Sequence, residues 1–166
     1  MLDYIQTITA YSWWAQHKIW QCTLTVSDAD FVKPLDYSVG SLHQQVVHVL
    51  WAEDLWYSRI HSLPRPDHSH LTLPTREDVR AAWDTIEGRW KAYVEALTPL
   101  ELERVVTFPR GNGEQLSLPV WQIIAHMVNH GTDHRGQMLR CIHDMGGETF
   151  EQDMFFYLRE LQLQSQ

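Results

Sequence analysis

Three histidines recur at four-residue intervals in HMVNHGTDHRGQ, residues 126–137 of the chain. On an α-helix, residues four apart lie about 40° apart around the axis and about 6 Å apart along it. His130 and His134 would therefore share one face, together with apolar side chains such as Ile123 and Met127. In a helical protein an apolar face points toward the core. The spacing thus predicts two neighbouring imidazoles that project inward from one helix.

A divalent metal ion would explain why two imidazoles project into a core. Two adjacent imidazoles in an apolar environment cannot both be charged, and the neutral rings still need partners. Neutral imidazole is a common metal ligand. A third ligand must come from another helix, and His48 in QQVVHVLWAEDLW is the best candidate because it lies mid-helix. Three such ligands leave a coordination position for water or substrate, which is the pattern of catalytic zinc.

The remaining histidines have simpler interpretations. His126 lies one turn from His130 but about 80° from His134, so one ion cannot easily bind all three, and we expect His126 to pack beside the site or to support a ligand. A bundle without metal, in which histidines only hydrogen-bond to one another, is a further alternative. Solvated surface is the expectation for the other six histidines, which lie near helix ends or in loops: His17, His43, His61, His68, His70 and His143.

Several polar residues near the histidines are candidates for supporting roles. Gln44 and Gln137 face the same way as the predicted ligands and could orient them by hydrogen bonds. No general base is evident. Asp133, Glu53 and Gln137 are close enough in sequence to be considered, but we expect the two carboxylates on a solvated helix surface. We expect Arg135 at the helix surface or in a dimer contact.

Other active-site classes lack their motifs in this chain. No E-x-x-H is present, so a ferritin-like di-iron bundle lacks its ligands, and no H-E-x-x-H is present for a zinc protease. The sequence has no phosphate-binding G-x-x-x-x-G-K-[ST] loop. Cys22 and Cys141 lie far apart without C-x-x-C spacing, and we interpret them as a pair of reduced thiols.

Four long helices are predicted to position these residues. Apolar spacing and turn signals place them at residues ~2–26, from Ser41 to about His61, from Thr75 to about Leu97, and from Pro119 to the glycine pair 146–147. Thr75 and Asp78 resemble a capping box. A short last helix is expected at residues ~151–163.

The segment RVVTFPRGNGEQLSLPV, before the fourth long helix, differs from the rest. Its polar and apolar residues alternate around a PRGNGE turn, which predicts a short β-hairpin. The fold class is therefore all-α, a four-helix bundle with a small inserted hairpin. The absence of a repeat or a linker favours a single domain over residues 1–166.

Composition limits the partners. The chain has 166 residues, with 13 basic and 21 acidic side chains and a formal charge of −8. Such an acidic balance argues against nonspecific binding to nucleic acid or to an anionic membrane. No leader peptide is evident and no apolar run approaches 18 residues, so we expect a soluble, cytoplasmic protein without a membrane partner.

The stretch HMVNHGTDHRGQMLRCIHDMGGE resembles the signature helix of the DinB-like (YfiT-like) family of metal-dependent enzymes, in which HRGQ follows another histidine by four residues. SVGSLHQQVVHVLWAEDLWYSRI is similar to the family's second helix, YSWWAQHKIW to its first, and DMFFYLRE to its usual ending. The resemblance covers nearly the whole chain. It implies an up-down-down-up four-helix bundle, a homodimer, and a metal bound by His48, His130 and His134.

The resemblance also narrows the function. Its relatives include S-transferases that use bacillithiol or glutathione, and mycothiol-dependent isomerases. A metal-dependent enzyme is therefore expected, in which zinc or nickel activates water or a low-molecular-weight thiol for reaction with a small electrophilic substrate. The alternative is a non-catalytic metal-binding module of a stress response. An open channel to the metal would favour the enzyme, and a sealed site would favour the module.

Overall fold

The computed structural model describes residues 1–36, 38–69 and 71–164. Within these ranges the long helices are α1 (Leu2–Thr23), α3 (Leu42–Ile60), α4 (Arg76–Glu95) and α6 (Val120–Asp144). The short elements are α2 (Asp28–Val32), α5 (Pro99–Glu103), β1 (Val105–Pro109), β2 (Gln115–Pro119) and α7 (Met154–Gln164).

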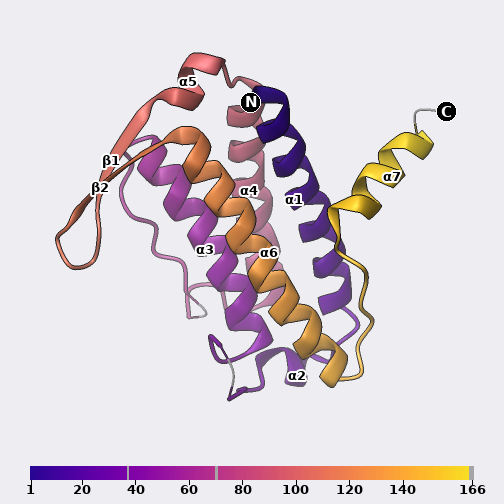
Figure 1. Cartoon of the computed structure of the whole chain (residues 1–166). Coiled ribbons are helices and arrows are strands. Elements are labelled where there is room, and N and C mark those ends of the chain that lie inside the picture. Colours follow the sequence, from indigo (N-terminus) through magenta and orange to yellow (C-terminus); the bar gives the residue numbers. More distant parts are fainter. Residues whose placement is uncertain (37, 70, 165–166) are drawn as a thin grey trace.

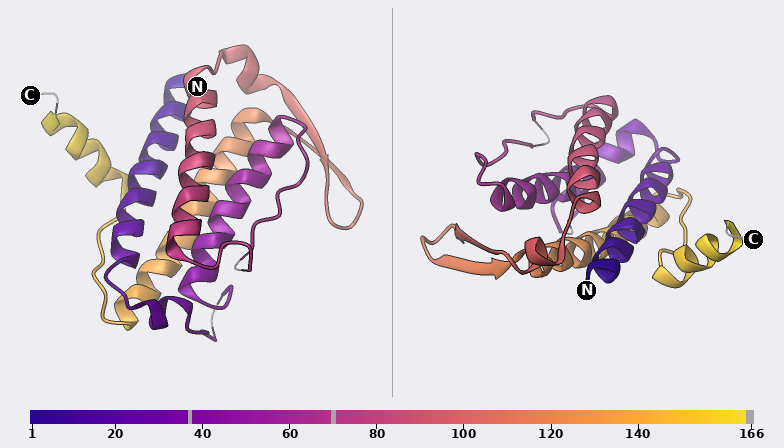
Figure 2. Two further views of the ribbon diagram at one scale, coloured as in Figure 1. Left: turned by 180° about the vertical axis from the view of Figure 1, so that it is seen from behind. Right: turned by 90° about the horizontal axis from the view of Figure 1, so that it is seen from above.

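The four long helices form a bundle in up-down-down-up order (Figure 1). α1 and α6 run in one direction, and α3 and α4 run in the other. The hairpin and α7 project from opposite sides of the bundle (Figure 2). Because α3 and α4 are parallel, the segment between them, described at residues 61–69 and 71–75, returns along the length of the bundle. The prediction of an all-α bundle with one small hairpin before the last long helix and a short C-terminal helix is confirmed.

Local sequence signals account for the helix boundaries. Ser41 caps α3 by accepting a hydrogen bond from the backbone N–H of Gln44, and Thr75 and Asp78 form the predicted capping box of α4. α6 ends in a Schellman motif, in which the N–H of Gly146 and that of the next residue donate to carbonyls of the last turn. Gly146 has a φ of +78°, a conformation that favours glycine.

The core forms where the apolar stripes of the four helices meet. A single cluster of buried side chains joins all four long helices. Burial of this apolar surface is the main stabilising contribution to such a fold. The largest side chains with almost no exposed surface include Ile5, Ile19, Leu42, Leu50, Ile86, Trp90, Ile123, Ile124, Met138 and Ile142.

The hairpin pairs β1 with β2 in antiparallel register, with Thr107 opposite Ser117. Their hydroxyl oxygens lie 2.8 Å apart. Phe108 and Val106 alternate inward from β1, as the sequence pattern predicts.

Three details differ from the sequence prediction. Two five-residue helices, α2 and α5, were not predicted. They are capped by Ser27 and Thr98, and each is about one turn, too short to show an apolar period. Pro119 is the N-cap of α6 and the end of β2, rather than a residue of the first helical turn.

Among the residues that the structure describes, no helix combines the length and the apolar character that a membrane crossing requires.

Candidate metal centre

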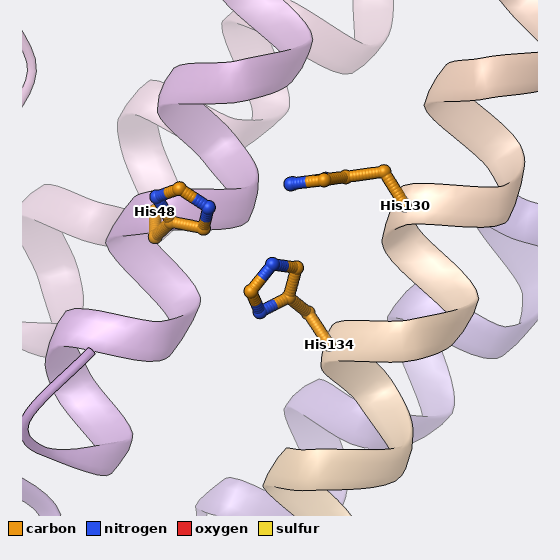
Figure 3. A group of neighbouring side chains, drawn as sticks. All are labelled: His48, His130 and His134. Atoms are coloured by element: carbon orange, nitrogen blue, oxygen red, sulfur yellow. The ribbon is translucent and has the colours of Figure 1, made fainter. Parts of the chain in front are cut away.

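The structure brings His48, His130 and His134 together. His48 projects from the middle of α3, and the other two project from successive turns of α6, so that the three rings face a common space (Figure 3). One nitrogen of each ring lies within 4.8 Å of one nitrogen of each of the others. The centre of the His48 ring lies 5.2 Å from that of His130 and 4.6 Å from that of His134. The two rings from α6 lie 4.4 Å apart.

Packing of α3 against α6 fixes this arrangement. On α6, Ile123, Met127 and Met138 are buried above and below the histidines, and on α3 Val47 and Leu50 are buried on either side of His48. Tightly packed apolar side chains one or two turns away immobilise the helix backbone that carries each histidine. The imidazoles are therefore carried on two rigid elements, which holds them close together.

Burial keeps the three imidazoles neutral. His134 is 8 % exposed, and the other two are half-buried. Burial, with smaller contributions from the neighbouring His134 and His48, lowers the pKa of His130 to about 4. Burial also lowers the pKa of His48, with a contribution from His134, and it lowers the pKa of His134. At neutral pH all three nitrogen lone pairs are free of protons that a metal would have to displace.

A chain of hydrogen bonds sets the tautomer of His134. Its Nδ1 lies 2.9 Å from Oε1 of Gln45, whose Nε2 donates to Oε1 of Gln137 at 3.2 Å. Nε2 of Gln137 donates to Oδ2 of Asp133 at 3.1 Å, and the Ser38 hydroxyl donates to the Gln137 oxygen at 2.5 Å. An ionised carboxylate only accepts, so Asp133 fixes the direction of both amides. Nδ1 of His134 must therefore carry the proton, and its Nε2 lone pair remains available.

This chain corrects the prediction for the supporting glutamines. Gln137 takes part as predicted, but it reaches His134 only through Gln45. Gln45 is buried and contacts His134, whereas Gln44 lines a cavity beside His48. Counting by 100° steps on one helix could not separate these neighbours, because their roles depend on how α3 is rotated against α6.

His126 lies beside the group and outside it. It is exposed, its ring centre lies 5.9 Å from that of His130, and its ring packs edge-on against Trp56 at 5.0 Å. The group of nitrogens within 4.8 Å does not include it. Of the two roles expected for His126, packing beside the site and supporting a ligand, these contacts show the packing.

The prediction of solvated surface holds for some of the other histidines. It holds for His17, His61 and His143, which are exposed. It holds only in part for His68, which is half-buried and has Nε2 2.8 Å from the Asp54 carboxylate. The prediction is wrong for His43, which is 4 % exposed and has Nε2 2.7 Å from the carbonyl oxygen of Leu73. His70 lies outside the described residues.

Two charged residues predicted at the surface are buried. The guanidinium of Arg135 is fully buried and donates to Ser12 at 3.2 Å and to Thr132 at 2.9 Å. Glu53 is 4 % exposed and accepts a hydrogen bond of 2.6 Å from Gln16, and burial raises its pKa to about 7. The surface predictions for Arg135 and Glu53 are therefore wrong. α6 packs against α1 as well as α3, so its buried face is wider than the histidine stripe suggests.

One cavity is lined by His48, and a second cavity lies next to the first. The smaller, about 210 Å³, is lined by His48, Trp51, Gln44 and, from the segment before α4, His68 and Ser69. The larger, about 500 Å³, lies between the C-terminal half of α3, the segment that follows it and the hairpin. Trp51 lines both cavities, so they are neighbours.

The comparisons with known proteins identify the family and support the fold. A model of the DinB family matches residues 1–163, and the chain belongs to that family. The fold is similar to a solved DinB-like protein from Bacillus subtilis, with a TM-score of 0.64 and 16% identity over 87% of this chain and 95% of that one. A DinB-like protein from Bacillus cereus gives a TM-score of 0.59 and 16% identity, over 82% and 89% of the two chains. No curated protein matches the sequence.

Proposed function

We propose that His48, His130 and His134 hold one divalent metal ion, and that the protein is a metal-dependent enzyme acting on a small electrophilic molecule. The observation that carries this proposal is the meeting of three neutral imidazole nitrogens, from two packed helices, within 4.8 Å of one another. A cavity reaches one of these three residues, His48.

The donor set fits such an ion. Tetrahedral zinc binds imidazole at about 2.0–2.1 Å, which corresponds to nitrogens about 3.3 Å apart. Small rotations of the three rings about their side-chain bonds would reach that spacing. Zinc and nickel both suit imidazole donors, and we propose one of these two ions. The lowered pKa values support binding at neutral pH, because no proton competes for the nitrogens.

A divalent ion at this position would supply Lewis acidity, lowering the pKa of a water or holding a low-molecular-weight thiol as its thiolate. The residues of the chain supply the rest. Gln45 orients the His134 ring, and the ligands contribute no charge, so the positive charge of the site would not be neutralised by them. The resemblance of the signature helix favours thiol transfer to the substrate over hydrolysis.

The alternative, a non-catalytic metal-binding module, is less well supported. A purely structural metal site is closed by four protein ligands. Within the described ranges, the group contains three potential ligands, and a cavity of about 210 Å³ is open at His48. This opening favours a site at which a small molecule reacts.

A cytoplasmic homodimer completes the proposal. The two free, buried thiols of Cys22 and Cys141 fit a reducing compartment.

α7 has no buried residue, and it carries exposed apolar side chains such as Phe155 and Leu163, which a second subunit could cover. Light scattering coupled to size-exclusion chromatography would measure the mass, and a monomer at micromolar concentration would contradict the dimer.

Metal analysis of tag-free protein tests the central proposal. After reconstitution with zinc or nickel and removal of excess ion, mass spectrometry should find about one ion per chain. His48→Ala, His130→Ala and His134→Ala should each lose it, whereas His126→Ala, the matched control on the same helix, should retain it. A wild type without metal, or three variants that keep it, would overturn the proposal.

A further inference from the structure

The larger cavity contains two arginines without a counter-charge. Arg59, from the last turn of α3, and Arg65, from the segment after it, both line this space of about 500 Å³. Neither pairs with a carboxylate anywhere in residues 1–36, 38–69 and 71–164. By contrast, Arg110, which follows β1 and also lines this cavity, pairs with Glu114 at 3.1 Å. The other arginines that pair with a carboxylate are Arg76, Arg80, Arg89, Arg104 and Arg140.

The absence of a partner is unexpected in this chain. Acidic side chains outnumber basic ones by 21 to 13, so carboxylates are plentiful. Two guanidinium groups near one another repel, and both burial and the charge of Arg65 lower the pKa of Arg59. Arg59 is half-buried and Arg65 is exposed, so solvent screens part of this repulsion, and a bound anion would relieve the rest.

Aromatic rings hold the guanidinium groups in place. Arg59 lies beside two rings that pack edge-on against each other, with its guanidinium carbon 4.4 Å from the centre of Trp56 and 4.5 Å from that of Phe108. Arg65 lies 5.2 Å from the centre of the Trp51 ring. A guanidinium stacked on a ring keeps its N–H edge free for a carboxylate or a phosphate. Stacking therefore preorganises donors, as in a binding site.

The cavity lies within reach of the three histidines. Trp51 lines it, and the ring of Trp51 is stacked 6.2 Å from that of His48. Arg59, another lining residue, follows His48 by eleven positions on α3, which places it on the same face and about 16 Å along the axis. A molecule of about that length could occupy the cavity and the histidine site together.

We propose that this cavity binds the anionic end of an elongated substrate, with a carboxylate or phosphate on Arg59 and Arg65 and an apolar body against Trp51, Leu55 and Phe108. The opposite end of the molecule then reaches the histidines. Assignment of the ligand as a substrate rests on the proposed function, but binding of the anion does not require a metal.

Calorimetric titration of the metal-free protein tests this site. The probes are 2-naphthoate, its neutral counterpart 2-naphthamide, and inorganic phosphate. Naphthoate should bind at least about ten-fold more tightly than the amide, a difference of ~1.4 kcal/mol. Arg65→Gln and Arg59→Gln should each remove most of that preference, and Arg140→Gln, an arginine of α6 that lines neither of these two cavities, should leave it unchanged. Circular dichroism would establish that each variant folds.

The outcomes separate this inference from the metal proposal. Equal binding of naphthoate and naphthamide, or a preference that survives loss of Arg65 in folded protein, would overturn the anion site. Arginine-dependent binding of phosphate that exceeds that of naphthoate would support the site and assign it to phosphate esters. The protein could bind naphthoate through the arginines and yet take up neither zinc nor nickel. That result would support the anion site and contradict the metal proposal.

Discussion

His134 donates its Nδ1 proton to Oε1 of Gln45, 2.9 Å away across the contact between α3 and α6. This bond joins the two helices that carry the candidate ligands, and it selects the nitrogen that faces His48 and His130. The tautomer is therefore a property of the helix packing. Loss of the Gln45 amide would leave the imidazole free to rotate or to exchange its proton between nitrogens.

Replacement of Gln45 by leucine should weaken zinc binding by about 10- to 100-fold, because the partner that orients a ligand is lost while the ligand remains. Competition with a chromophoric chelator would measure the affinity. Gln6→Leu is the matched control, since Gln6 donates to the carbonyl of Val94 far from the site. Equal affinity of the Gln45→Leu protein and the wild type would show that the hydrogen bond does not control the ligand.

His130 should make the metal-free protein less stable in acid. Its folded pKa of about 4 lies below the unfolded value near 6.5, so the unfolded chain binds more protons between these two values. Its contribution to the free energy of unfolding is present above pH 6.5 and is lost as the pH falls toward 4. Urea unfolding of wild type and His130→Gln between pH 4.5 and 8 would measure the difference. A wild-type advantage that does not shrink below pH 6 would contradict this assignment.

Glu53 should have the opposite pH dependence. Burial raises its folded pKa to about 7, above the unfolded value near 4.5, so its contribution is fully present below pH 4.5 and is lost as the pH rises through 7. Glu53→Gln keeps the shape and remains neutral. Relative to wild type, this variant should gain stability between pH 5 and pH 8, as measured by urea unfolding. If the difference between the two proteins is constant over that range, the carboxyl group is not protonated in the folded state.

Arg135 should be essential to the bundle, in contrast to the exposed Arg140 on the same helix. Arg135→Met should cost about 3 kcal/mol, because it removes the hydrogen bond to Ser12 of α1 and leaves the buried Glu53 without its nearby positive charge. Arg140→Met should cost less than ~1 kcal/mol, because its pair with Asp144 is at the surface. Thermal unfolding of both variants at pH 7.5 would compare them. Similar losses would show that burial of Arg135 does not determine its importance.

The sequence allowed prediction of those features that depend on local signals. Ser41, Thr75 and Gly146 mark helix ends by capping groups that act within a few residues, and these boundaries are confirmed. The pairing of His130 with His134 follows from helical geometry alone. The three histidines that the structure brings together are those the sequence singled out.

Features that depend on the packing of one helix against another could not be predicted. Gln45 rather than Gln44 reaches His134, because α3 is rotated by an angle that the spacing of one helix does not encode. Arg135 and Glu53 are buried beside α1, which supplies their hydrogen-bond partners Ser12 and Gln16, and the sequence of a single helix gives no sign of this. The sequence did not indicate that Arg59 and Arg65 share a cavity, because that cavity forms only where the hairpin packs beside α3.

The long connection between α3 and α4 has a consequence for how such a protein can diversify. Because those helices are parallel, the connecting segment must return along the length of the bundle, and it supplies Leu63 and Arg65 to the larger cavity and His68 and Ser69 to the smaller. The candidate ligands lie on the helices, and this segment carries none of them. Insertions and substitutions in one exposed loop can therefore reshape what enters both cavities while the histidines stay in place. A lineage built on this bundle can acquire new specificities without rebuilding its reactive centre.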